Sequence, residues 1–448
     1  ETGRPGSQGP PGPRGPKGTA GQPTYSNCDL IQFLRSHSQK CPVYPTELVF
    51  ALDQSSGITE RRFNETRDIM TSIVSDLNIR ENNCPIGARV VVVSYDSDTS
   101  YLIRGSDYQS KKHLLQLLSQ IKYQVPQKAR DIGNAMRFVA RNAFKRTSSG
   151  SNVRRVAVFF SNGQAASRES ILTATMEFSA LDISLAVFAY NERVFLDEAF
   201  GFDDTGTFQV IPVPPVGNYE PLERLRRCTL CYDKCFPNTC AEETFFPENS
   251  YMDVALLLDN SRHIANDDFQ AMKTLVSSVI DNFHITSNPS ASDRIALMSY
   301  SPSENSRKKS KVKTEFEFTT YDNLSIMKNY IHTSIRQLNG DATIGLGLQW
   351  AMENLFPGTP NPRKHKVIIV ISAGENHEEE EFVRTVSLRA KCQGYAVFVV
   401  SLGSTQRDEL EQLASYPRDH HLIQLGRMHK PDLNYIVRFL KPFVYSVR

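Results

Sequence analysis

The sequence has no run of 18 apolar residues, and its amino end carries no apolar segment. A membrane-spanning helix needs about 20 apolar residues, so we expect neither membrane insertion nor a signal peptide. The sequence also has no large excess of charge of one sign, because it contains 51 Lys and Arg residues and 49 Asp and Glu residues. Nucleic-acid partners are therefore not expected. The densest basic cluster, residues 307–313, is expected to be a solvated loop, with binding of heparin-like polyanions as the alternative.

Catalytic motifs are missing as well. No G-x-S-x-G elbow surrounds Ser261, and the glycine-rich residues 340–347 lack the Gly-Lys-Ser/Thr ending of a phosphate-binding loop. Ser261 and His263 are two residues apart after a predicted strand, a spacing that does not place an imidazole on a hydroxyl. His420 and His421 are expected on a strand edge rather than on a metal. We therefore expect that the protein is not an enzyme.

Glycine recurs at every third position near the amino end, and this is the most specific pattern in the sequence. The repeat runs through Gly3, Gly6, Gly9, Gly12, Gly15, Gly18 and Gly21, and closes at Pro23. In a collagen triple helix only glycine fits on the crowded axis, and proline pre-sets the backbone angle. We predict that residues 1–23 are the tail of a longer triple helix, with residues 1–2 left over from expression. A disordered Pro/Gly linker is the alternative.

Three features together indicate a secreted protein. They are the eight cysteines, the collagenous segment, and two N-glycosylation sequons that begin at Asn64 and Asn323. Disulfides and N-linked glycans both form on the oxidising secretory route, so we expect an extracellular location.

Strand-like apolar runs alternate with helical stretches in the rest of the sequence, and the series occurs twice. The first series has runs at residues 48–52, 90–93, 156–160 and 185–188, and the second has runs at residues 254–258, 295–298, 367–370 and 396–400. Continuous apolar strands between helices are typical of a parallel sheet covered on both faces. We therefore predict an α/β fold class with two tandem, doubly wound, Rossmann-like parallel-sheet domains.

Landmark residues recur at a nearly constant offset, which indicates that one domain has been duplicated. The offsets are 206 residues for Asp53 and Asp259, 205 for Tyr95 and Tyr300, 212 for Gly133 and Gly345, and 211 for Gly163 and Gly374. Solenoid repeats have only about 20 to 50 residues, so this period means tandem domains. We place the domains at residues 46–227 and 251–448, a Cys-containing linker at residues 24–45, and a Cys-rich joint at residues 228–250.

The first strand of each copy ends in an aspartate that is followed two residues later by a serine. These pairs are Asp53 with Ser55 and Asp259 with Ser261. Open α/β sheets bind ligands at the carboxyl ends of their strands, and hard oxygen donors there suit Mg²⁺ or Ca²⁺. On these residues each copy resembles the von Willebrand factor A family. Joined to Gly-X-Y repeats, the pair resembles the carboxyl-terminal part of a collagen VI alpha chain.

The resemblance implies a metal site whose ligands are only partly present. That family holds a divalent cation with Asp-x-Ser-x-Ser, a Thr in a middle loop and an Asp after a later strand. The first copy keeps Asp53 and Ser55, but Gly57, Arg130 and Asn162 stand at the other three positions. An arginine brings a fixed positive charge to a ligand position and excludes a cation. We therefore expect a structural relic in the first copy.

The second copy has lost the same three ligands in a different way. It keeps Asp259 and Ser261, and the other positions hold His263, Ala342 and Ala373, with Thr343 or Asp341 nearby. One sure carboxylate would bind Mg²⁺ weakly without waters or a partner's oxygens. We therefore expect a relic here too and no cofactor, with weakly bound Mg²⁺ or Ca²⁺ as the alternative.

Four cysteines lie close together between the two copies, at Cys228, Cys231, Cys235 and Cys240. The spacing lacks the two separated pairs of a zinc knuckle, so in a secreted protein disulfides are expected. The segment resembles the Cys-rich joint of collagen VI chains. Cys28 and Cys41 are expected to pair with this joint or between chains. Cys84 and Cys392 are candidates for intradomain bonds or free thiols.

The resemblance also implies a function. Loss of both metal motifs is similar to the alpha-3-like group of collagen VI chains, which includes the alpha-5 and alpha-6 chains. Such a chain forms a heterotrimer with two other collagen VI alpha chains in the extracellular matrix, and its globular domains are expected to select those partners and to contact other matrix proteins or cell-surface receptors. The alternative is a metal-dependent adhesion or receptor-binding module, which would need intact ligands at Asp53 or Asp259.

Overall fold

A computed structural model describes most of the two domains and a few residues before them. The described residues are 28–29, 32–33, 36, 41–42, 45–81, 87–125, 128–144, 153–163, 167–191, 193–213, 220–231, 250–301, 312–338, 340–374, 376–402, 407–425 and 433–447. The predicted collagenous segment, residues 1–23, lies outside them, as do Cys84, Cys235, Cys240 and most of the basic cluster at residues 307–313.

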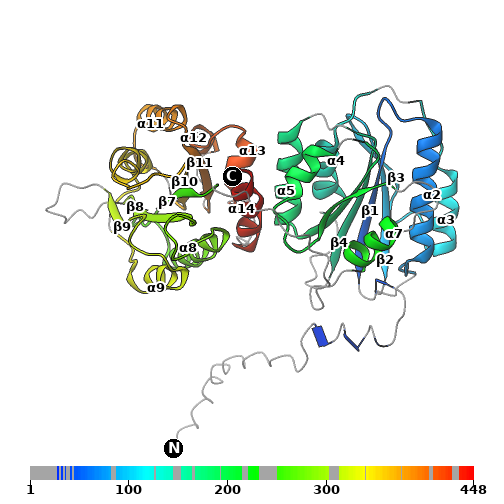
Figure 1. Cartoon of the computed structure of the whole chain (residues 1–448), viewed down its shortest axis with the longest axis horizontal. Coiled ribbons are helices and arrows are strands. Elements are labelled where there is room, and N and C mark those ends of the chain that lie inside the picture. Colours follow the sequence, from blue (N-terminus) through cyan, green and yellow to red (C-terminus); the bar gives the residue numbers. More distant parts are fainter. Residues whose placement is uncertain are drawn as a thin grey trace, which may run out of the picture.

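The first domain is built on a six-stranded sheet with the order β3-β2-β1-β4-β5-β6. Its strands are β1 Thr46–Asp53, β2 Ala88–Tyr95, β3 Thr99–Ile103, β4 Arg154–Ser161, β5 Ile183–Ala189 and β6 Phe208–Pro212. The central strands are almost entirely buried, because helices cover both faces of the sheet (Figure 1). This burial explains the continuous apolar runs of the sequence.

The second domain repeats this sheet in the same connectivity, with the order β12-β11-β10-β7-β8-β9. Its strands are β7 Met252–Leu258, β8 Arg294–Ser299, β9 Lys313–Phe316, β10 His365–Ser372, β11 Ala396–Ser401 and β12 Leu422–Gln424. The match confirms the predicted duplication of one α/β domain.

One edge of each sheet adds an antiparallel strand to the predicted parallel sheet. Strand β3 pairs with β2 in the antiparallel sense, and β9 pairs with β8 in the same way. Each pair contains a register shift, at Val92/Val93 and at Leu297/Met298. The other strand pairs are parallel, so both sheets are mixed rather than purely parallel. The edge strands carry polar residues and lack the apolar runs on which the prediction rested.

Helices pack on both faces of each sheet. Those of the first domain are α2 Glu60–Asp76, α3 Lys111–Gln120, α4 Ile132–Phe138, α5 Arg168–Ala180, α6 Val194–Phe200 and α7 Glu220–Leu225, with π-helical turns η1 Val139–Ala143 and η2 Arg226–Leu230. Those of the second are α8 Asn266–Val279, α9 Leu324–Ser334, α10 Ile344–Trp350, α11 Glu380–Cys392, α12 Arg407–Leu413, α13 Arg418–His421 and α14 Leu433–Val447, with η3 Ile280–Asn282 and η4 Ala351–Leu355. None of the described helices is long and apolar enough to cross a membrane.

Helix α14 lies between the two domains, beside α5 of the first (Figure 1). Its residues Phe439 and Phe443 pack on Phe398 of β11, and Met176 and Ala180 of α5 belong to the same buried cluster. The core of the second domain therefore continues into a helix of the first.

Two residues expected on a strand edge lie in a helix instead. His420 and His421 end α13, immediately before β12, and His420 Nε2 lies 2.9 Å from the carbonyl oxygen of Glu169 in the first domain. This inter-domain contact could not be read from the sequence, because it depends on how the two domains pack.

A disulfide joins the segment before the first domain to the segment after it. It links Cys41 to Cys231, which immediately follows η2. Cys28 and Cys228 are each disulfide-bonded as well, whereas Cys392 is an exposed free thiol. The start of the Cys-rich joint is therefore packed against the first domain.

Candidate functional site

Asp53 ends β1 at the carboxyl edge of the first sheet and is 4% exposed. Its Oδ1 atom accepts hydrogen bonds from the Ser55 backbone N–H at 2.9 Å and from the Ser55 hydroxyl at 2.6 Å. Its Oδ2 atom accepts from Arg130 Nε at 2.6 Å and from the Asn162 backbone N–H at 2.9 Å. A carboxylate offers about four lone-pair positions, so the protein itself saturates Asp53.

Arg130 supplies the positive charge that a bound cation would otherwise bring. In this ion pair the arginine side chain is 11% exposed and the aspartate side chain 2% exposed. A guanidinium stays charged at any ordinary pH and occupies one carboxylate oxygen. The residues at the first strand-end site therefore do not fit a divalent cation.

Two other residues at family ligand positions bond to each other. Asn162 donates from Nδ2 to the carbonyl oxygen of Gly57 at 3.0 Å. Gly57 has a φ of 98°, in the left-handed region that favours glycine over the serine of the family motif. The loop after β1 is thus closed by the chain's own polar groups.

Asp259 holds the matching position after β7, and it is fully buried. Its Oδ1 atom accepts from the Ser261 backbone N–H at 3.0 Å, and its Oδ2 atom accepts from the backbone N–H groups of Ala373 and Gly374 at 3.3 and 3.1 Å. In the described part of the chain no basic side chain pairs with this carboxylate. Backbone N–H groups thus stabilise the Asp259 carboxylate, whereas Arg130 stabilises the Asp53 carboxylate in the first domain.

Ser261 is 1% exposed, and its buried hydroxyl has no hydrogen-bond partner among the described residues, in contrast to the hydroxyl of Ser55. A Cβ atom added to Gly374 would lie 3.5 Å from both Ser261 Oγ and Asp259 Oδ2, so these two oxygens face the same spot. Mg²⁺ and Ca²⁺ take six or more oxygen ligands, most of which would have to come from water here. The second strand-end site therefore fits the family's cation poorly.

A buried tyrosine lies behind each aspartate. Tyr95 donates its hydroxyl to the Phe160 carbonyl at 2.7 Å, and Tyr300 donates to the Ile371 carbonyl at 3.1 Å. Burial, with the nearby aspartate charge, raises the pKa of both phenols well above the usual value. These tyrosines therefore remain neutral donors, and each reaches across the strand that carries the aspartate, β1 or β7, to bond to the strand beyond it.

Residues 47–204 and 253–435 match the family described as von Willebrand factor type A domain. The chain belongs to the von Willebrand factor type A domain family. Each matched segment spans most of one sheet, with β6 lying beyond the first segment, which confirms the resemblance predicted from the strand-end motifs.

The chain is also similar to collagen VI alpha chains, as its Gly-X-Y repeats and paired domains predicted. It is 86% identical over 96% of its length to the collagen alpha-5(VI) chain of Mus musculus, and 71% identical over 96% to that of Homo sapiens. It is 48% identical over 96% of its length to the collagen alpha-6(VI) chain of Homo sapiens. The chain spans only 16%, 17% and 20% of the lengths of these three relatives.

The second von Willebrand factor A domain carries a further polar cluster at the same edge. His263, at the position of the family's last serine, places Nε2 3.0 Å from Asp341 Oδ1, and its ring stacks on His377 with centroids 5.1 Å apart. The sequence indicated that His263 and Asp341 lie near the family site. It gave no signal for His377, which the loop after β10 brings to them.

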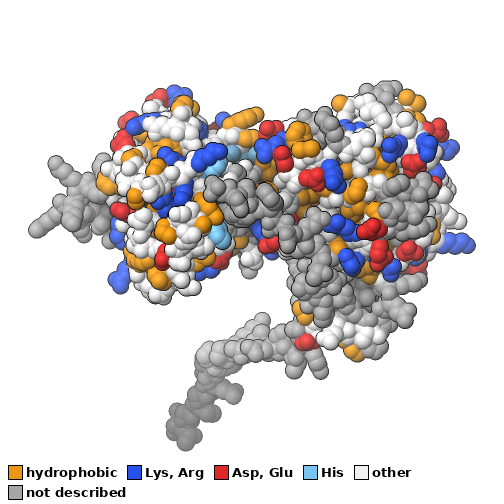
Figure 2. All heavy atoms as spheres, viewed as in Figure 1, with side chains coloured by type: hydrophobic (Ala, Val, Ile, Leu, Met, Phe, Trp, Pro, Cys, Tyr) orange, Lys and Arg blue, Asp and Glu red, His pale blue; other side chains and the backbone are white. Residues whose placement is uncertain are grey.

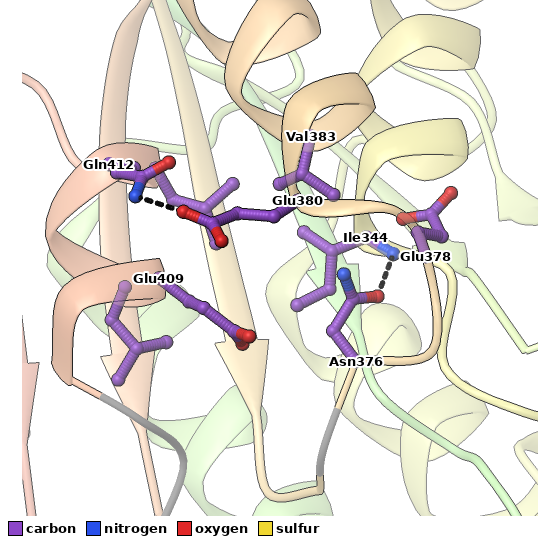
Figure 3. Close-up of a pocket in the computed structure, with 9 residues that line it drawn as sticks. Ile344, Asn376, Glu378, Glu380, Val383, Glu409 and Gln412 are labelled. Carbon is purple, nitrogen blue, oxygen red and sulfur yellow. Dashed lines mark hydrogen bonds between the residues drawn. The ribbon is translucent and has the colours of Figure 1, made fainter.

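A pocket of the second domain is lined by acidic and amide side chains together with aliphatic ones (Figure 3). Glu378 accepts from the backbone N–H groups of Gly345 and Leu346 at 2.5 and 3.0 Å, and therefore caps α10. Glu380 accepts from Gln412 Nε2 at 2.7 Å. The lining residues include no Ser, Cys or His, so the pocket offers no hydroxyl or thiol nucleophile and no imidazole base.

The two sequons differ in accessibility. Asn64 is half-buried within α2, and Thr66 of the same sequon is 5% exposed and donates its hydroxyl to the Arg62 carbonyl. Asn323 is exposed, and its Oδ1 atom caps α9 by accepting from the Ser325 backbone N–H at 2.8 Å. Glycosylation at both asparagines remains a prediction, and Asn323 is the more accessible of the two.

Proposed function

We propose that this chain is a structural chain of the extracellular matrix, secreted and assembled with two other collagen VI alpha chains into a heterotrimer. The observation that carries this proposal is the 86% identity to the collagen alpha-5(VI) chain of Mus musculus over 96% of the chain. The predicted triple-helix tail before the first domain agrees with it, because such a segment is stable only with two partner chains.

In this proposal the two domains act as one unit in chain selection. Besides the shared cluster of α5 and α14, Ser179 Oγ donates to the Arg438 carbonyl at 2.9 Å, and Arg137 pairs with Asp419 at 3.1 Å. A fixed domain pair presents one continuous surface to partner chains. A Gly-X-Y rod distinguishes its partners poorly, so this surface would set the choice and register of chains.

The surface suits recognition by shape and by individual polar pairs. On the face seen in Figure 2, basic and acidic side chains lie among one another on both domains. This agrees with the formal net charge of +2 and favours protein partners over a polyanion. Other matrix proteins and cell-surface receptors are further partners of the same kind.

We also propose that assembly needs neither catalysis nor Mg²⁺ or Ca²⁺. Arg130 occupies the Asp53 carboxylate in the first domain, and three backbone N–H groups hold Asp259 in the second. A metal-dependent adhesion module would need free ligands at one of these positions.

The test is light scattering on the chain alone and co-expressed with the carboxyl-terminal regions of two other collagen VI chains, with non-reducing gels alongside. We expect a one-to-one-to-one complex that survives EDTA. Co-expression with chains of a different collagen type is the control and should give no complex. A monomer under every condition would contradict chain selection by these domains, and dissociation in EDTA would contradict the metal-independent mechanism.

A further inference from the structure

Two imidazoles and one carboxylate converge at the carboxyl edge of the second sheet. His263, Asp341 and His377 each offer one ligand atom, and these atoms all lie within 4.8 Å of one another. The group does not include Asp259 or Ser261, the two ligands that the domain keeps from the family motif. This set of ligand atoms therefore differs from that of the family site. It has two imidazole nitrogens and one carboxylate oxygen, where the family site has oxygen ligands.

The three residues come from three loops that backbone hydrogen bonds tie together. The Arg262 N–H, beside His263, donates to the Gly340 carbonyl at 3.1 Å. The His377 N–H donates to the Ala342 carbonyl at 3.2 Å. His377 is thus bonded to a neighbouring loop through its own backbone, and His263 and Asp341 are adjacent in sequence to residues that make such bonds. The backbone positions of all three residues are therefore fixed before a cation binds.

Two further contacts anchor these loops to the body of the domain. Gln337 Nε2 donates to the carbonyls of Ser261 and Ile264, at 2.7 Å in both cases, and so holds the turn that carries His263. The Thr343 N–H donates to the Tyr300 carbonyl at 3.1 Å, which fixes the loop of Asp341 to the end of β8.

The chemistry of this donor set selects the ion. Imidazole nitrogen suits zinc and its transition-metal neighbours, whereas Mg²⁺ and Ca²⁺ take oxygen ligands. Tetrahedral zinc with bonds of about 2.1 Å places its ligand atoms about 3.4 Å apart. The pair of His263 Nε2 and Asp341 Oδ1, at 3.0 Å, is already close to that separation. The longest separation, at most 4.8 Å, has to shorten by about 1.4 Å to reach the tetrahedral separation. Side-chain rotation can supply this, because both histidines are exposed.

We propose that His263, Asp341 and His377 bind one zinc-class divalent cation in the second von Willebrand factor A domain. Three protein ligands leave the fourth tetrahedral position for water or for a donor from a partner chain.

Arg262 is the competitor for this site. Its Nη2 atom lies 2.9 Å from Asp341 Oδ1, and its Nε atom lies 3.3 Å from His263 Nε2. Without metal, the guanidinium thus supplies the positive charge beside the carboxylate. Its side chain is 45% exposed, against 11% for Arg130 in the first domain, so an incoming cation can displace it into solvent.

The experiment is calorimetric titration of the full chain with zinc chloride alone. We expect one bound ion, at least tenfold weaker binding in each of His263→Asn, Asp341→Asn and His377→Asn, and tighter binding in Arg262→Gln. The matched controls are His113→Asn, an exposed histidine of the first domain, and Cys392→Ser, which removes the exposed thiol. Both should leave the affinity unchanged. Because all these residues are at least partly exposed, circular dichroism should show every variant folded.

Other outcomes would overturn the proposal. Absence of zinc binding, or binding that His263→Asn and His377→Asn leave unchanged, would exclude these ligands. Loss of zinc binding in Asp259→Asn but not in the histidine variants would place the ion on the family's strand-end residues. Displacement of zinc by millimolar Mg²⁺ would show an oxygen site, whereas resistance to Mg²⁺ would support a nitrogen-rich one.

Discussion

The two von Willebrand factor A domains bury the same strand-end carboxylate and stabilise it in different ways. In the first, Asp53 accepts four hydrogen bonds, one of them from the charged Arg130. In the second, Asp259 accepts three bonds, all from backbone N–H groups. In the first domain the Arg130 guanidinium stands where the family holds a metal cation. In the second domain the backbone N–H dipoles of the loops stabilise the carboxylate instead. A degenerate metal site therefore need not become an unstable one.

The two ways of stabilising the buried carboxylate differ in their sensitivity to mutation. A buried charge is costly unless it is paired or hydrogen-bonded, and the first domain makes that pairing depend on one side chain. The second domain depends on loop backbone, which no single side-chain deletion removes. Mutational sensitivity should accordingly be concentrated at Arg130 in the first domain and dispersed in the second.

The largest effect is expected for Arg130→Ala. The change leaves the Asp53 carboxylate buried without its counter-charge, and breaking such a pair costs about 3–5 kcal/mol of unfolding free energy. Trp350, the single tryptophan, lies at the end of α10 and reports on the second domain. We expect the first-domain part of the circular dichroism transition to move to lower denaturant while the Trp350 fluorescence transition stays in place.

The control is Arg168→Ala, which removes an ion pair with Glu198 whose side chains are 54% and 47% exposed. Exposed pairs contribute less than about 1 kcal/mol. Equal effects of the two arginine changes would contradict a special role for Arg130.

A change at the shared core should destabilise both domains at once. Met176 of α5 is fully buried in the cluster that includes α14, and its replacement by alanine should cost about 2–5 kcal/mol. Both the circular dichroism and the Trp350 transitions should move. Met70→Ala is the matched control, because Met70 is equally buried but belongs to a cluster of the first domain alone. A Trp350 transition that Met176→Ala leaves unmoved would show that Met176 does not contribute to the stability of the second domain.

The sequence predicted the parts of this fold whose signal is local. Central strands such as β2 and β10 are buried on both faces, so they stand out as continuous apolar runs. The edge strands β3 and β9 carry residues such as Ser100 and Lys313, and their antiparallel pairing has no equivalent local signal.

The same division applies to the candidate sites. The replacement of a family ligand by Arg130 was visible from the motif alone, and its contact with Asp53 follows from the shared fold. His377 reaches His263 only because the backbones of two separate loops bond to each other. That bond depends on tertiary packing, and no residue spacing indicates it.

Acid should destabilise the second domain. Burial, with the nearby charges of His420 and Lys391, lowers the pKa of His421 from the ordinary 6.5 to about 4. The unfolded chain binds this proton near pH 6.5 while the folded chain does not, so stability is fully present above pH 6.5 and is lost as the pH falls towards 4. The loss reaches about 3 kcal/mol. Urea titrations followed by Trp350 fluorescence between pH 7 and 4 measure it.

His421→Gln should flatten this pH dependence, because glutamine does not titrate. His113→Gln removes an exposed histidine of the first domain and should leave the profile as it is. A profile that remains equally steep in His421→Gln would assign the acid sensitivity to other groups.

The smallest change in unfolding free energy is expected at the two matching serines, Ser55 and Ser261. It compares the two strand-end sites most directly. Ser55→Ala removes the 2.6 Å hydrogen bond from a hydroxyl to the Asp53 carboxylate, and should cost about 1–2 kcal/mol. Ser261→Ala removes a buried hydroxyl that has no partner among the described residues, and should be neutral or slightly stabilising. Urea titrations of both variants give the two differences. If Ser261→Ala costs as much as Ser55→Ala, then the Ser261 hydroxyl bonds to something in solution, and a bound water or cation beside Asp259 would be the group to identify.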